Sequence, residues 1–275
     1  MIEFLKVIFL GIVEGITEWL PISSTGHMIL VDEFIKLNVT PEFKNMFLVV
    51  IQLGAIMAVV VIFWKKIMPL KMNKAGKLHI SKPIFDMWLK ILVSCLPAAI
   101  IGILFDEFFE KHFYNPVSIA IALIVFGIFF IVVENARQGK EDRVTLLSQL
   151  TYKDAVIIGL FQVIAAIFPG TSRSGATIVG ALMFGVSRYV ATEFTFFLAI
   201  PVMFGASLLK LVGFGFNFTA TEAGMLIVGM VTAFVVSIIA IKFLLVYIKK
   251  NDFKVFGWYR IILGVIVLAY FLLIK

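Results

Sequence analysis

Charged residues are scarce in this chain. Asp, Glu, Lys and Arg make up 15% of its 275 residues, whereas ordinary globular chains contain about 25%. Hydrophobic residues make up 61%, and Phe alone occurs 29 times. Such a lipid-soluble composition excludes a two-domain soluble protein. It predicts a single integral membrane domain over residues 1–275.

Cysteine is almost absent, because Cys95 is the only one in the sequence. A lone cysteine excludes a disulfide within the chain and provides no zinc-binding spacing. Acidic residues are outnumbered by basic ones, and a net charge of +7 is compatible with a nucleic-acid partner. The lysines, however, lie beside apolar stretches, where loop topology in a membrane explains them better. We therefore expect no nucleic-acid partner.

Long apolar stretches dominate the rest of the sequence. Six of them are close to the ~20 residues that a membrane-spanning helix needs, and they lie at 46–64, 84–105, 116–133, 190–212, 223–247 and 256–274. We therefore predict an all-α polytopic membrane protein with about six transmembrane helices.

Two further apolar segments are interrupted. The segments 2–20 and 153–168 each run into a proline and then glycine, and shorter helical pieces follow at 24–37 and 175–185. A broken helix with polar loop residues at membrane depth is typical of a re-entrant helix–loop–helix hairpin. The alternative is an ordinary spanning helix followed by a surface loop. Two carboxylates in the first segment favour re-entrance, because they need a protein-lined or watery cavity.

The two interrupted segments share one pattern. Residues 11–27 and 159–175 each contain an apolar helix that ends at a proline and opens into a loop of Gly, Ser and Thr. At a fixed offset of 148 residues, Pro21 aligns with Pro169 and Ser24 aligns with Ser172. The pattern predicts an internal repeat, with halves of approximately 1–133 and 150–275.

The charges of the connections orient the chain. The 65–83 connection contains six lysines and is expected in the cytoplasm, whereas the acidic 106–115 connection is expected outside. With six crossings, the first hairpin then enters from outside and the second from the cytoplasm. The two halves therefore have opposite orientation, which is the inverted-repeat architecture of many transporters, with the functional site near the midplane.

Two carboxylates stand out in the first hairpin. Glu14 and Glu18 are four residues apart, so they share one face of a helix. Their neighbours are apolar, which argues against a solvated helix face, and charged groups are costly at membrane depth without a function. Two adjacent carboxylates can hold a divalent cation, or one of them can act as a base.

The loops after the two prolines contain the remaining polar groups. They comprise Ser23, Ser24, Thr25, Gly26 and His27 in the first copy, and Gly170, Thr171, Ser172, Arg173 and Ser174 in the second. Backbone N–H groups at helix entries bind anions, and a guanidinium fork suits bidentate phosphate binding. Helix capping alone explains a run of Ser and Thr equally well. If the loops converge, they form a phosphate pocket with donors from both sides.

Both loops resemble a known family. Residues 14–27 (Glu-Gly-Ile-Thr-Glu-Trp-Leu-Pro-Ile-Ser-Ser-Thr-Gly-His) and 169–177 (Pro-Gly-Thr-Ser-Arg-Ser-Gly-Ala-Thr) resemble the two signature motifs of the undecaprenyl-diphosphate phosphatase family, the bacitracin-resistance proteins. The stretches 52–56 and 197–201 also resemble this family, and the resemblance covers essentially the whole chain. It implies a multi-pass enzyme of the bacterial cytoplasmic (inner) membrane that hydrolyses undecaprenyl diphosphate to undecaprenyl phosphate, the lipid carrier of peptidoglycan synthesis. Phosphate would be released by a site facing outside.

The resemblance also implies the active residues and a divalent cation, Mg²⁺ or Ca²⁺. Glu14 and Glu18 would hold the cation, or Glu18 would act as base, and Arg173 would neutralise the diphosphate. Ser24 is the leading nucleophile, with His27 or an activated water as rivals. Substrate-binding roles are expected for Ser23, Thr25, Gly26, Gly170, Thr171, Ser172 and Ser174. The expected partners are a polyprenyl diphosphate and membrane lipids, and a homo-oligomer is left open.

A transporter or flippase of polyprenyl phosphate is the alternative function. Broken helices in an inverted repeat form a translocation architecture, and a structural or channel protein is a third interpretation. An anion carrier needs cations and backbone amides, but it gains nothing evident from two carboxylates. Glu14, Glu18 and His27 together with a hydroxyl therefore favour chemistry over transport.

Overall fold

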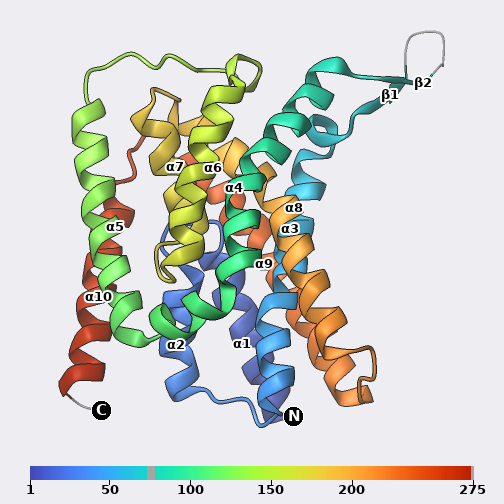
Figure 1. Ribbon diagram of the computed structural model, residues 1–275. Helices are drawn as coiled ribbons and strands as arrows, with labels where there is room; N and C mark the ends of the chain where they lie inside the picture. Colours follow the sequence, from blue (N-terminus) through green and yellow to red (C-terminus); the bar gives the residue numbers. More distant parts are fainter. Residues whose placement is uncertain (73–77, 274–275) are drawn as a thin grey trace.

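The computed structural model describes residues 1–72 and 78–273, and helices make up nearly all of it (Figure 1). The α-helices are α1 (Ile2–Thr17), α2 (Ser24–Phe34), α3 (Pro41–Ile67), α4 (Lys82–Phe113), α5 (Pro116–Arg137), α6 (Tyr152–Ile167), α7 (Arg173–Met183), α8 (Arg188–Phe214), α9 (Ala220–Tyr247) and α10 (Lys254–Leu273). Strands β1 (Leu70–Met72) and β2 (Leu78–Ile80) pair antiparallel, and a 3₁₀ turn, η1, covers Leu147–Gln149.

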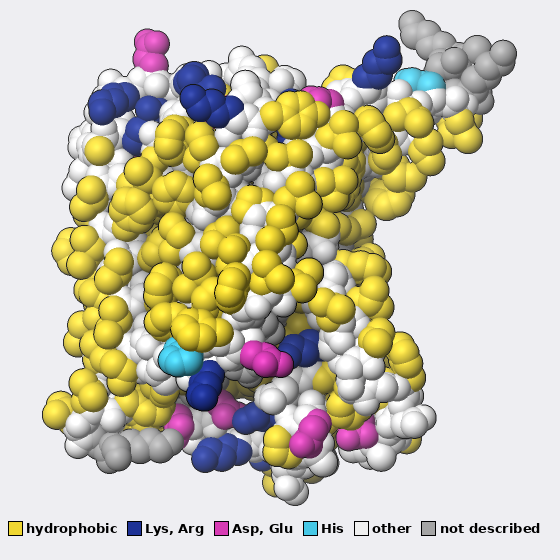
Figure 2. Space-filling view, viewed as in Figure 1, with side chains coloured by type: hydrophobic (Ala, Val, Ile, Leu, Met, Phe, Trp, Pro, Cys, Tyr) yellow, Lys and Arg dark blue, Asp and Glu magenta, His cyan; other side chains and the backbone are white. Residues whose placement is uncertain are grey.

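Six of the helices are long and apolar enough to cross a membrane. They are α3, α4 as far as Phe105, α5, α8, α9 and α10, and they match the six predicted stretches. Figure 2 shows apolar side chains over the middle of the visible face, with charged side chains toward its two ends. The predicted fold class, an all-α multi-pass membrane protein, is confirmed. Several bounds differ by a few residues, since α3 begins at Pro41 rather than 46 and α5 ends at Arg137 rather than 133. The largest difference is in α4, which continues as a helix beyond residue 105 to Phe113.

The two interrupted segments form helix–loop–helix hairpins, α1–α2 and α6–α7. They enter the bundle from opposite ends. Figure 1 places both chain termini at one end, called the termini end here, and the β1–β2 hairpin with the α5–α6 connection at the other, the β-hairpin end. Re-entry of the hairpins into a membrane and the division into halves 1–133 and 150–275 stay predictions.

Each hairpin is held by a long helix from the other part of the chain. Helix α1 packs against α9, and α6 packs against α4. Gly11 and Gly15 form the close contact of α1, since a Cβ on either would lie 2.8 Å from the Cβ of Thr232 or Val236. Small residues spaced four apart allow helix backbones to approach this closely in membranes. The tip of the first hairpin is thereby fixed inside the bundle.

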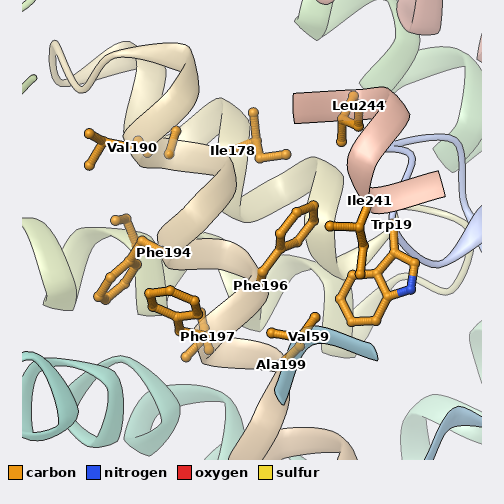
Figure 3. Close-up of a cluster of buried hydrophobic side chains, with 14 of the residues drawn as sticks. Trp19, Val59, Ile178, Val190, Phe194, Phe196, Phe197, Ala199, Ile241 and Leu244 are labelled. Atoms are coloured by element: carbon orange, nitrogen blue, oxygen red, sulfur yellow. The ribbon is translucent and has the colours of Figure 1, made fainter. Parts of the chain in front are cut away.

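Trp19 anchors that tip in the apolar core. Its side chain is fully buried, and its ring meets the ring of Phe196 edge-on, with centroids 5.1 Å apart. Figure 3 shows the indole beside Ile241 of α9 and Val59 of α3. A fully buried aromatic side chain contributes several kcal/mol, of the order lost on truncation to Ala, ~3–5 kcal/mol. Because Trp19 directly follows Glu18, this packing also sets the position of that carboxylate.

Candidate active site

Both loops enter their second helix in the same way. Ser23 and Ser172 are the N-cap residues of α2 and α7, and their Oγ atoms accept the backbone N–H of Gly26 and Gly175 at 3.3 and 3.1 Å. The structural counterpart of Ser172 is therefore Ser23. The predicted alignment of Ser24 with Ser172 is wrong by one residue.

The two caps are strained. Ser23 has a φ of 74° and Ser172 a φ of 71°, and they are the two positive-φ non-glycine residues in the described part of the chain. Such conformations cost about 1–3 kcal/mol and concentrate at functional sites. The helices α2 and α7 are each 11 residues long, and their N-termini begin at these two caps. Helix N-termini carry partial positive charge and favour anions.

The loops meet at Glu18. Arg173 donates from Nη2 to Glu18 Oε1 at 3.0 Å, and Ser24 donates from Oγ to Glu18 Oε2 at 2.9 Å. Ser174 donates from its hydroxyl to the backbone carbonyl of Glu18 at 3.3 Å. One carboxylate thus joins a hydroxyl from the first loop to a guanidinium from the second, and the three groups lie largely buried.

A backbone carbonyl of α8 helps to orient the guanidinium of Arg173. Its Nη1 donates to the Thr195 carbonyl at 3.1 Å, and Thr177 Oγ1 donates to the carbonyl of Arg173 at 2.9 Å. The hydroxyls of Thr177 and Thr195 are themselves 2.9 Å apart. Thr195 lies on α8 and was not anticipated from the sequence. The network fixes the guanidinium while its Nε remains without a partner.

A second guanidinium, that of Arg260, ties the two loops together, and sequence reasoning missed it. Arg260 lies on α10 and is 0% exposed. Its Nη1 donates to the carbonyl of Pro21 at 3.3 Å, and its Nη2 donates to those of Gly170 and Thr171 at 3.0 and 2.7 Å. The available signal was a single arginine inside the apolar stretch 256–274, since an intramembrane charge is a functional-site hypothesis by default.

Gly170 makes this arrangement sterically feasible. Its φ is +93°, and a Cβ on it would lie 2.6 Å from the carbonyl oxygen of Ile119. Only glycine combines this backbone conformation with so close an approach. The adjacent Thr171 side chain is fully buried, and its hydroxyl has no partner. Gly26 contributes its N–H to the Ser23 cap, and the half-buried Thr25 side chain makes no hydrogen bond to the described residues.

His27 has partners away from Glu18. Its Nδ1 lies 2.7 Å from the Ser23 carbonyl, and its Nε2 lies 2.7 Å from the hydroxyl of Tyr259. Because a carbonyl only accepts, Nδ1 must carry the proton, so in neutral imidazole Nε2 accepts from Tyr259. The two rings are also stacked, with centroids 5.6 Å apart. Both ring nitrogens are thus engaged, and Tyr259 is a further residue that the motifs did not reveal.

Glu14 is buried, at 1% exposure, and its Oε1 has no hydrogen-bond partner. In the part of the chain that the structure describes, all buried side-chain polar atoms without a partner belong to the two hairpins or to Arg260, namely Glu14 Oε1, Trp19 Nε1, Gln162 Oε1, Thr171 Oγ1, Arg173 Nε and Arg260 Nε. Buried polar groups are normally paired. Their concentration here is what a polar ligand-binding site requires.

The donor set suits a hard divalent cation that shares its ligands with a substrate. Glu14 offers an unpartnered carboxylate oxygen one helical turn from Glu18. Mg²⁺ is commonly bound by one or two carboxylates together with substrate phosphates. No group of three or more His, Cys, Asp and Glu side chains near enough to hold a metal is found among the described residues. Two carboxylates therefore fit such an ion together with further oxygen ligands, which a bound phosphate can supply.

A cavity of about 1100 Å³ leads to Arg173 between α4, α6 and α8. Its polar lining residues are Glu107, Gln162 and Arg173, and its other lining residues are mostly apolar. Ile103, Leu104 and Leu209 line it and are 79%, 66% and 70% exposed. Because these side chains belong to the lipid-soluble surface of the bundle, the cavity connects the guanidinium with an apolar environment.

The fold and this site define a multi-pass membrane protein with a buried polar centre that opens into a mostly apolar cavity. The model of the family described as "Bacitracin resistance protein BacA" matches residues 7–266. The chain therefore belongs to the bacitracin-resistance protein family, as the resemblance of the two motifs predicted.

Close relatives have a common name. An undecaprenyl-diphosphatase of Desulfitobacterium hafniense is 65% identical over 98% of this chain and 97% of that protein. Undecaprenyl-diphosphatase 1 of Clostridium acetobutylicum is 64% identical over 99% of both chains. An undecaprenyl-diphosphatase of Enterococcus faecalis is 60% identical over 97% of this chain and 96% of its own.

Proposed function

We propose that this protein hydrolyses undecaprenyl diphosphate to undecaprenyl phosphate and inorganic phosphate, and so recycles the lipid carrier of cell-wall synthesis. The observation that carries the proposal is the junction at Glu18, which holds the Ser24 hydroxyl and the Arg173 guanidinium. A hydroxyl bonded to a carboxylate is an activated nucleophile, and a guanidinium recognises phosphate. The names of the relatives support the choice of substrate.

Ser24 is the proposed nucleophile. Its Oγ attacks the terminal phosphorus while Glu18, 2.9 Å away, takes the hydroxyl proton. The bond from that phosphorus to the bridging oxygen breaks, and the lipid monophosphate leaves with the electron pair. Water then attacks the phosphoserine and releases one proton to solvent, while Glu18 returns its proton to the departing Ser24 Oγ. Phosphate leaves with the oxygen and the remaining proton of that water. The engagement of both nitrogens of His27 favours Ser24 over the imidazole as the attacking group.

Arg173 links substrate binding to this proton transfer. Its guanidinium donates to Glu18 Oε1. A more highly charged phosphate competes for the same fork, and the guanidinium then stabilises the charge of the transition state. The exchange frees Glu18 Oε1 from the guanidinium while Oε2 stays bonded to the Ser24 hydroxyl. The exchange therefore couples phosphate capture to activation of the nucleophile.

Glu14 and Glu18 would hold a divalent cation, Mg²⁺ or Ca²⁺. The bound cation would supply neutralisation of the diphosphate charge. The apolar cavity between α4, α6 and α8 suits the polyprenyl chain, because it extends from Arg173 to the lipid-facing surface. With the tail in this cavity, the charged head group can reach Arg173 without crossing hydrocarbon. Such a crossing is costly for a charged group.

The termini end is proposed to face outside. Positive charge predicts that the β-hairpin end, with its many lysines, is cytoplasmic. Cysteine at the exposed Asn38 should therefore react with a membrane-impermeant thiol reagent in intact cells. Cysteine at the exposed Lys140 should react only after permeabilisation. Both variants need a Cys95→Ala background, and the reverse labelling pattern would place the site on the cytoplasmic side.

Phosphate release from undecaprenyl diphosphate by the purified protein in detergent tests the proposed function. We expect Arg173→Lys to lower the rate about 100-fold or more, because charge without the fork is a poor replacement. Ser24→Ala should abolish turnover, and Arg137→Lys at the periphery should retain it. Undiminished release by Ser24→Ala would exclude the serine mechanism. Movement of polyprenyl phosphate across vesicles without any phosphate release would instead favour the transporter alternative.

A further inference from the structure

A second pocket lies at the β-hairpin end of the bundle. Its volume is about 550 Å³, and it is formed where α3 ends, α4 and α8 begin, and η1 crosses between them. It shares no lining residue with the cavity that leads to Arg173. Four lysines line it, namely Lys65, Lys66, Lys71 and Lys90.

Two of these lysines are neutralised by carboxylates. Lys66 Nζ lies 2.5 Å from Glu193 Oε1, and Lys90 Nζ lies 2.5 Å from Asp86 Oδ2. Both carboxylates also line the pocket. Each pair is therefore close to neutral and attracts a charged ligand only weakly.

The other two lysines give the pocket an excess of positive charge. In the described ranges 1–72 and 78–273, no carboxylate lies within ion-pair distance of Lys65 or Lys71. With four lysines against Glu193 and Asp86, the lining has a net charge of +2. An anion is the ligand that this charge favours.

The remaining lining is amphipathic. Hydroxyl groups come from Thr145, Ser148 and Tyr189, and apolar side chains come from Pro83, Ile84, Met87, Leu146, Leu147 and Val190. A free phosphate would gain nothing from such apolar contacts, whereas a lipid with an anionic head group would use both kinds of surface.

We propose that this pocket binds the head group of an anionic glycerophospholipid. Its place at the lysine-rich end, expected at the cytoplasmic surface, agrees with this ligand, because anionic lipids of that leaflet attract basic pockets between helices. The phosphate lies against Lys65 and Lys71, and the first acyl carbons contact Leu146 and Leu147. The bound lipid joins the starts of α4 and α8, the two long helices that line the cavity leading to Arg173.

Native mass spectrometry of the full-length protein in detergent, titrated with phosphatidylglycerol, tests the proposal. The test variant is Lys65→Gln with Lys71→Gln. Each lysine at a lipid head group contributes roughly a fivefold gain in binding, so we expect the double variant to lose about 30-fold in affinity. The matched control is Lys140→Gln with Lys250→Gln, which removes the same charge from exposed sites at the same end and should leave the affinity unchanged.

Three outcomes would overturn the assignment. Equal losses in the two double variants would show attraction to total charge rather than to a pocket. Equal binding of phosphatidylcholine and phosphatidylglycerol by the unchanged protein would exclude recognition of an anionic head group. Displacement of phosphatidylglycerol by millimolar inorganic phosphate would identify a site for free phosphate. These measurements do not depend on phosphate release, so they are independent of the proposed enzymatic function.

Discussion

Replacing Arg260 by lysine tests whether a single guanidinium holds the two loops in register. The substitution keeps the charge but removes the fork, which reaches Pro21 through Nη1 and both Gly170 and Thr171 through Nη2. A lysine ammonium near one loop leaves the other unbound. Hydrogen bonds to a charged group contribute about 1.5–3 kcal/mol each, so losing one or two of them should cost roughly 2–6 kcal/mol.

Part of that free energy should appear as lost activity. A shift of about 1 Å between Ser24 and Arg173 can lower a rate about 100-fold, so we expect a fall of that order in kcat/KM for Arg260→Lys. Unfolding in mixed micelles and phosphate release from undecaprenyl diphosphate are the two assays. Arg137→Lys, at a peripheral arginine that binds Asp142, is the control. Wild-type unfolding together with wild-type kcat/KM in Arg260→Lys would refute the reasoning.

Two further predictions concern the carboxylates and the loop backbone. Glu14→Gln and Glu18→Gln should each weaken the apparent affinity for Mg²⁺ or Ca²⁺. Excess cation should partly restore the activity of the Glu14 variant, because Glu14 Oε1 has no protein partner. Loss of turnover with unchanged cation dependence would assign the residue to proton transfer instead. Gly170→Ala should destabilise the protein by at least about 1–3 kcal/mol, because φ is +93° and the new Cβ would meet a carbonyl at 2.6 Å. Gly102→Ala, inside α4 and with nothing within 4 Å of the new Cβ, should be at least as stable as the wild type.

The spans could be predicted because length and hydropathy alone determine them. The stretch 84–105 corresponds to Lys82–Phe105, and 223–247 corresponds to Ala220–Tyr247. The continuation of α4 to Phe113 was not predicted, since charged residues after 105 were interpreted as a loop. A helix tolerates such residues where its end leaves hydrocarbon, because Glu and Lys are good helix formers. Hydropathy therefore locates where a membrane is crossed, but not where a helix stops.

The site could be predicted only in part, because sequence motifs do not show three-dimensional partners. The two loops were identified from their repeated pattern, and the structure places Ser24 and Arg173 on the same carboxylate. A fixed offset cannot detect the one-residue shift that makes Ser23 the counterpart of Ser172. Arg260 lies outside both motifs, and nothing local to it indicates which carbonyls it binds. Its role depends on contacts with residues more than 85 positions away.

The position of Arg260 on the last helix has a consequence for biosynthesis. The ribosome produces Glu14 and Glu18 long before it produces Arg173, and Arg260 comes later still. Until α10 takes its place, the carbonyls of Pro21, Gly170 and Thr171 lack the donor that joins them. A nascent chain can therefore insert its earlier helices without having a working site. The two loops are joined only after α10 has packed against them.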